Sequence, residues 1–173
     1  IMRTDGTLAG TSLVAANMQV PYLSATPGST QRRHIGWNGK LIMSASFDFF
    51  NYEPLITDGT EQGSMMLKNI NTSTLPSNAQ NRDKISSFPA WFCEYRNKVY
   101  FAAQSTEFDR ELWMTDGTEA GTVRMLDIYA GPNGSGPAEV QTIGSGLMFV
   151  ATDLAHGREL WVSDGTAAGT RCL

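Results

Sequence analysis

The sequence predicts an all-β fold built from tandem, four-stranded antiparallel units of about 50 residues. Three observations support it: a recurring turn motif, an apolar segment at a fixed distance before that motif, and no segment with capped helical periodicity. The turn motif occurs as TDGTLAGT from Thr4, TDGTEQGS from Thr57, TDGTEAGT from Thr115 and SDGTAAGT from Ser163. Successive aspartates of the motif are separated by 53, 58 and 48 residues, which is a spacing typical of repeat architectures.

The apolar segments form a second ladder in register with the first. LIMSAS from Leu41, VYFAAQ from Val99 and LMFVAT from Leu147 each begin 17 residues before the aspartate of the following turn. All variation in the period therefore falls in the polar connections between one motif and the next apolar segment. A constant core with variable connections indicates a repeated supersecondary unit.

Within each unit we expect four short strands in sequence order. The first is RRHIGW, AWFCEY or EVQTI, and a tight turn (NGK, RNK or GSG) leads from it into the apolar second strand. The third is YEPLIT, RELWMT or RELWVS, and the fourth begins at the Gly-Thr pair. In the third strand, Glu159 and Trp161 should face one side and Leu160 and Val162 the other, so both faces suit packing between sheets. Helix should be nearly absent.

The recurrent Asp-Gly-Thr residues are expected to be structural. Glycine permits a positive φ, and the Asp and Thr side chains can bond to their own turn. Recurrence in every unit also favours a structural role, because an active site is usually built once. The predicted turn residues are Asp5, Gly6, Thr7, Asp58, Gly59, Thr60, Asp116, Gly117, Thr118, Asp164, Gly165 and Thr166.

The segments RELWMTDGTEAGT and RELWVSDGTAAGT resemble the ELWxxDGTxxGT repeat that occurs in tandem in large secreted and surface proteins. The resemblance covers essentially the whole chain, although YEPLITDGTEQGS departs from the pattern. It implies blades of a partial β-propeller, and an extracellular or cell-surface location. The expected organisation is a half blade (strands three and four) plus loop at 1–30, a blade with a long loop at 31–87, a blade at 88–137 and a final blade at 138–173, as a piece of a larger propeller.

The charge balance argues against two classes of partner. With 13 basic and 17 acidic residues, a net charge of -4 and no Lys/Arg cluster, the chain is not expected to bind nucleic acid. No apolar run is long enough to predict a membrane span.

No catalytic signature is evident, and we expect no enzyme activity. G-x-S-x-G and H-E-x-x-H strings are absent, and the two histidines, His34 and His156, are interpreted as ordinary surface or packing residues. Glu53, Glu111 and Glu159 recur at one position, and we expect them to pair with Arg110 and Arg158 or to accept bonds from an adjacent blade. Glu107, Asp109 and Glu111 alternate along one strand, for which a solvated hairpin is preferred over a site.

No cofactor is expected. Calcium is the alternative, because Asp and Thr oxygens are suitable ligands, but the motif lacks the D-x-D-x-D spacing of a calcium loop. Cys93 and Cys172 lack metal-ligand spacing, and the sequence leaves open whether they pair.

Two surface features are candidate interaction sites. Phe47, Phe49, Phe50 and Tyr52 lie in a presumed hairpin tip, either as a partner or sugar-stacking patch or packed on the loop after Asn71. Asn71 and Asn133 begin glycosylation sequons in expected surface loops.

Together these features predict an extracellular structural or interaction module for assembly or adhesion, without catalysis. Its partners would be other protein chains or the missing blades of the same chain, with glycans as an alternative. The alternatives are a glycan-binding or glycan-hydrolysing propeller and a calcium-dependent adhesion repeat.

Overall fold

The computed structural model describes residues 2–4, 6–14, 18–19, 32–78 and 80–173. They form one two-stranded and three four-stranded antiparallel sheets, and each four-stranded sheet is a simple meander in chain order. The prediction of an all-β chain of four-stranded units is confirmed. The strands are β1 (Met2–Arg3) and β2 (Ser12–Leu13); β3 (His34–Trp37), β4 (Lys40–Ala45), β5 (Glu53–Thr57) and β6 (Met65–Met66); β7 (Ala90–Tyr95), β8 (Lys98–Gln104), β9 (Arg110–Thr115) and β10 (Val123–Leu126); and β11 (Ala138–Ile143), β12 (Gly146–Asp153), β13 (Gly157–Ser163) and β14 (Arg171–Cys172).

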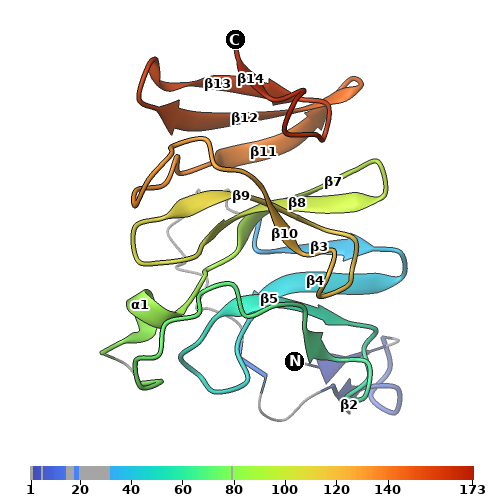
Figure 1. Cartoon of the computed structure of the whole chain (residues 1–173). Helices are drawn as coiled ribbons and strands as arrows, with labels where there is room; N and C mark the ends of the chain where they lie inside the picture. Colours follow the sequence, from blue (N-terminus) through green and yellow to red (C-terminus); the bar gives the residue numbers. More distant parts are fainter. Residues whose placement is uncertain (1, 5, 15–17, 20–31, 79) are drawn as a thin grey trace.

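The three four-stranded sheets, called the first, second and third blades below, stack in chain order (Figure 1). Their first strands come closest to one another: β7 packs against both β3 and β11. The backbone N–H of Phe92 in β7 also donates to the carbonyl of Arg32, just before β3, at 3.2 Å. The first strands therefore form the inner side of the stack, a point on which the sequence was silent.

Two hydrophobic clusters hold the blades together. Alternation along β8 sends Phe101 to the cluster shared with the first blade and Tyr100 to the cluster shared with the third. In β9, Trp113 and Leu112 divide in the same way. The central blade is thus apolar on both faces, as expected of a sheet between two others, and each fully buried side chain of this size contributes about 1.5–3 kcal/mol.

The repeated turn is a closed network of short-range hydrogen bonds. The N–H and hydroxyl of Thr118 donate to one carboxylate oxygen of Asp116 at 3.0 and 2.7 Å, while Gly117 has a φ of 86°. A Cβ built on Gly121 would lie 1.9 Å from that same oxygen. The second glycine of the motif is therefore required because the aspartate side chain occupies the space that any larger residue would need.

Helix is confined to one short element in the described part of the chain. The helix α1 (Arg82–Ile85) lies in the long connection between β6 and β7, and the sequence did not predict it. It buries Ile85 but has no side-chain cap at Asn81. Its position depends on the packing of Ile85, because four residues are too few for a helix that is stable alone.

We predict that Gly121→Ala destabilises the fold by about 1–3 kcal/mol, because the new methyl group meets the Asp116 carboxylate. Gly36→Ala is the matched control, since a Cβ there meets nothing within 4 Å. Chemical unfolding of both variants, and of Gly121→Ala combined with Asp116→Ala, measures the effect. If the double variant loses as much as the sum of the two single changes, steric contact is not the cause.

Candidate functional site

A buried glutamate lies at the start of the third strand of the first and second blades, as the first residue of β5 and the second of β9. Glu111 is 0% exposed and accepts hydrogen bonds from the backbone N–H groups of Ile128, Tyr129 and Ser135 at 3.3, 3.1 and 2.8 Å. The hydroxyl of Ser135 also donates to it, at 2.5 Å. All of these donors belong to the connection that leads into the third blade, so the carboxylate fixes that connection to the strand.

Glu53 has the same arrangement in the first blade. It is 0% exposed and accepts from the N–H groups of Ile70 and Asn71 at 3.0 and 3.3 Å and from the hydroxyl of Ser87 at 2.6 Å. Burial raises the pKa of Glu53 from its usual value of 4.5 to about 8, against the opposing effect of these donors. Burial raises the pKa of Glu111 as well.

The expected pairing of these glutamates with arginines is wrong. Arg110 donates to the carbonyls of Phe88 and Ala102 at 3.0 and 3.1 Å, and Arg158 donates to that of Gly136 at 3.3 Å. Glu159, the third of the recurrent glutamates, is exposed. The other expectation was hydrogen bonds from an adjacent blade. The donors to Glu53 and Glu111 lie instead in the connections that lead to the next blade.

The structure places the described turn residues where their side chains bond to their own turns. Asp58 and Asp164 each accept from the N–H and hydroxyl of the threonine two residues later, as Asp116 does. In the first copy, Thr7 accepts from the N–H of Gly10 at 2.9 Å. Asp5 lies outside the described residues. These hydrogen bonds lower the pKa of Asp58, Asp116 and Asp164.

The acidic residues that alternate before the third strand of the second blade do not converge. Glu107 is exposed, and the carboxylate of Glu111 in β9 is buried against the connection to the third blade. Asp109 accepts hydrogen bonds from Ser105 and Arg124, each at 2.5 Å. Within the ranges that the structure describes, no group of three or more His, Cys, Asp or Glu side chains is placed to hold a metal ion.

The cysteines and histidines are also dispersed. Cys93 and Cys172 are free thiols. His34 is exposed in β3, and His156 contacts Asp153 in the hairpin between β12 and β13, at 2.8 Å. The thiol of Cys93 contacts the hydroxyl of Thr142 at 3.3 Å.

The aromatic hairpin tip is divided between surface and core. Phe47 and Phe49 are 37% and 52% exposed and Phe50 is half-buried, whereas Tyr52 is buried and stacks on Phe88 with ring centroids 5.8 Å apart. Asp48 organises the tip by accepting four hydrogen bonds, one of them from Ser77 in the long loop. Burial acts to raise the pKa of Asp48, but the hydrogen bonds outweigh it and lower that pKa to about 2.

The two sequons differ in accessibility. Asn133 is exposed. Asn71 is only 2% exposed, and its side-chain nitrogen donates to the carbonyls of Lys84 and Ser86 at 3.0 and 3.2 Å. The expectation that Asn71 lies in an open surface loop is therefore wrong, because the nitrogen that would carry a sugar is enclosed and already bonded.

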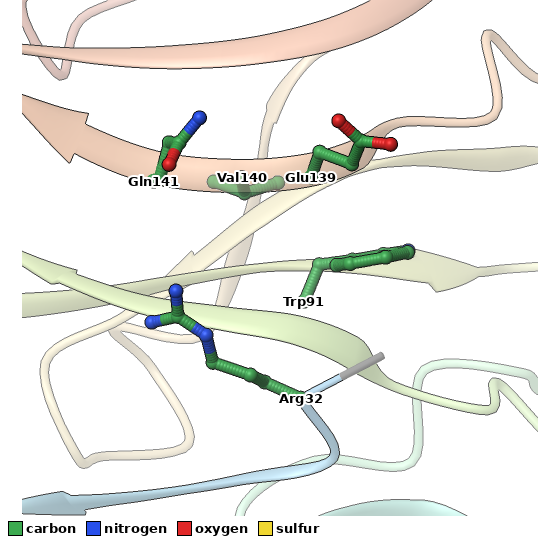
Figure 2. Close-up of a pocket in the computed structure, with 5 residues that line it drawn as sticks. All are labelled: Arg32, Trp91, Glu139, Val140 and Gln141. Atoms are coloured by element: carbon green, nitrogen blue, oxygen red, sulfur yellow. The ribbon is translucent and has the colours of Figure 1, made fainter. Parts of the chain in front are cut away.

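A hollow of about 510 Å³ lies on the inner side of the stack, lined by Arg32, Trp91, Glu139, Val140 and Gln141 (Figure 2). Trp91 and Glu139 are each the second residue of a first strand, and their φ values are 62° and 56°. The strand register shifts at both places, by one extra residue. These β-bulges re-aim the two side chains, as bulges beside functional sites often do.

Sequence reasoning missed this hollow. The bulges depend on how each first strand pairs with its second strand, and no residue type in the sequence marks their position. The one available sign was that a bulky or charged residue stands four positions before the end of each first strand, namely Arg33, Trp91 and Glu139.

No helix in the described ranges is long and apolar enough to cross a membrane. No protein-family model and no curated protein matches the chain. Two solved structures match it: a crystal structure of puromycin hydrolase and one of a mutant of that enzyme complexed with PGG. Each is 14% identical to this chain with a TM-score of 0.53, over 82% of this chain and 20% of the hydrolase chain. This chain thus spans about a fifth of the matched chain's length, and the likeness concerns the fold.

These matches overturn the expectation that the chain is not an enzyme. Both matched structures are of a hydrolase, so sheets arranged in this way occur within an enzyme. The expectation relied on missing catalytic strings in 173 residues, and a fold does not determine function. Missing strings therefore do not exclude catalysis.

We predict that the protein loses stability as the pH rises. Since the pKa of Glu53 is higher in the folded chain than in the unfolded one, its contribution is complete below pH 4.5 and is lost as the pH passes through about 8. Glu53→Gln should flatten the dependence of melting temperature on pH between about 5 and 8, because an amide does not titrate. Glu159→Gln, at the exposed equivalent position, should leave the slope unchanged. An unaltered slope in Glu53→Gln would contradict the assignment.

Proposed function

We propose that this chain is an extracellular structural and interaction module of the ELWxxDGTxxGT repeat family, whose blades form part of a β-propeller and act in assembly or adhesion. The observation that carries the proposal is the outer face of the third blade. Leu160 is 39% exposed there, whereas its equivalents are buried in the inner blades: Leu112 is 0% exposed in the second blade, and Pro54 is buried in the first. Ile143 is 50% exposed, whereas Tyr95 and Trp37 at the same position are 7% and 8% exposed.

The interfaces between the blades indicate what fits this face. In each of them the Asp-Gly-Thr turn of one blade packs on the end of the first strand of the preceding blade. A Cβ built on Gly117 would lie 2.7 Å from the ring of Trp37 at the end of β3. One built on Gly165 would lie 3.3 Å from the ring of Tyr95 at the end of β7, and 2.7 Å from the hydroxyl of Tyr100 in β8. The face at Ile143 is therefore suited to another blade with the same turn, whether from the same chain or from a second one.

The first copy of the turn offers a matching surface. A Cβ built on Gly6 would meet nothing within 4 Å, unlike one built on Gly59, Gly117 or Gly165. The chain thus presents a turn that no described residue covers and, at the other end of the stack, a face of the type on which such turns pack. Surfaces that differ and complement each other support head-to-tail association.

The extracellular part of the proposal rests on the repeat resemblance and on Asn133, an exposed sequon asparagine. Intact mass before and after enzymatic removal of N-linked sugar from the native protein tests it. Loss of mass that disappears in Asn133→Gln supports secretion. An unglycosylated native protein contradicts it.

We predict that Ile143→Lys and Leu160→Lys each weaken self-association about tenfold or more, because a buried lysine in the interface costs over about 1.4 kcal/mol. Sedimentation velocity over a range of concentrations measures the change. Leu154→Lys is the control, since Leu154 is 74% exposed in the hairpin between β12 and β13, away from this face. A wild-type chain that stays monomeric at every concentration would contradict association through this face.

A second candidate is that the chain forms part of a hydrolase. It is supported by the shared fold with puromycin hydrolase and by nothing at the level of residues. Incubation of the native protein with puromycin, followed by chromatography, tests it directly. Hydrolysis would favour this candidate, and an unchanged substrate would remove puromycin hydrolysis from consideration.

A further inference from the structure

The hollow on the inner side of the stack has the composition of a small-molecule site. Its volume of about 510 Å³ lies within the range of roughly 300–1,000 Å³ that such sites occupy. Val140 forms an apolar part of the wall, and the half-buried indole of Trp91 forms another. Figure 2 shows Glu139 and Trp91 on one side of the hollow and Gln141 and Arg32 on the other.

The polar groups of the hollow are available for a ligand. Among the described residues, the guanidinium of Arg32, the carboxylate of Glu139 and the amide of Gln141 have no side-chain partner. This differs from Glu53 and Glu111, whose carboxylates are fully used. Arg32 and Glu139 are exposed and Gln141 is half-buried, so their hydrogen-bonding atoms are accessible to a ligand that enters the hollow.

The backbone at this place is held in an unfavourable conformation. Trp91 and Glu139 both have positive φ, at 62° and 56°, and side chains in that region cost of order 1–3 kcal/mol each. Glycine would remove the strain at either position. The two blades instead place a tryptophan and a glutamate there, and both side chains line the same hollow.

The chemistry of the lining selects the class of ligand. An indole face packs well against the C–H face of a pyranose ring, since it is apolar with a polar edge. Carboxylate, guanidinium and carboxamide groups each present two hydrogen-bonding atoms in a plane, which suits pairs of adjacent hydroxyl groups. The charges of Arg32 and Glu139 cancel, so the hollow favours neither a cation nor an anion.

We propose that this hollow binds a neutral saccharide, with Trp91 as the stacking platform and Glu139, Gln141 and Arg32 as hydrogen-bonding groups. The site is separate from the exposed end face on which the proposed assembly function rests. It also differs from the aromatic hairpin tip at Phe47 and Phe49, which lies outside the lining of the hollow.

A broad array of immobilised neutral and charged glycans, probed with the native protein, tests the proposal. The expected result is binding to neutral glycans only. Ligand-observed NMR with the best soluble glycan then compares variants: Trp91→Ala and Glu139→Ala should each weaken binding about tenfold or more. Phe49→Ala is the matched control, because it removes an exposed aromatic ring elsewhere and should leave the affinity unchanged.

Trp91 packs partly against the core, so its loss can also disturb the fold. Glu139→Ala and Arg32→Ala change exposed side chains and keep the test decisive if Trp91→Ala fails to fold. Three results overturn the proposal: no neutral glycan bound, binding that persists in both Glu139→Ala and Arg32→Ala, or binding lost in Phe49→Ala instead. Loss of sugar binding with intact self-association would separate this site from the assembly face.

Discussion

The arrangement of the blades depends on a carboxylate buried at the start of the third strand. Glu111 accepts hydrogen bonds from three backbone N–H groups and one hydroxyl of the connection to the next blade. Glu53 accepts hydrogen bonds from two backbone N–H groups and one hydroxyl in the same way. Connections of irregular shape leave backbone donors without strand partners, and a buried donor without an acceptor costs about 1–3 kcal/mol. One side chain satisfies several of them and so fixes where the following sheet begins.

The fold could be predicted where the interactions are local. Asn38 and Gly39 both have positive φ, as their hairpin motif implies, and the alternation in β8 divides Tyr100 and Phe101 between two cores. The aspartate and the two glycines of each turn lie within a few residues of one another, so their spacing in the sequence is enough to predict that they contact each other. Such features need no knowledge of distant partners.

The candidate site could not be predicted, for the opposite reason. The partners of Glu111 lie up to 24 residues away in a connection whose length varies between blades, so the sequence suggested arginines instead. Trp91 and Glu139 lie together because of bulges in two strands and the packing of β7 against β11. Asn71 looked exposed from its polar neighbours, but it is enclosed by the segment around Lys84 and Ser86.

The long reach of the buried glutamates also has a consequence for where one repeat ends. Ser135 follows Glu111 by 24 residues and Ser87 follows Glu53 by 34. A blade cut off after its fourth strand would keep the buried carboxylate but lose the groups that donate to it. A unit with complete hydrogen bonding therefore extends past its four strands to the start of the next blade.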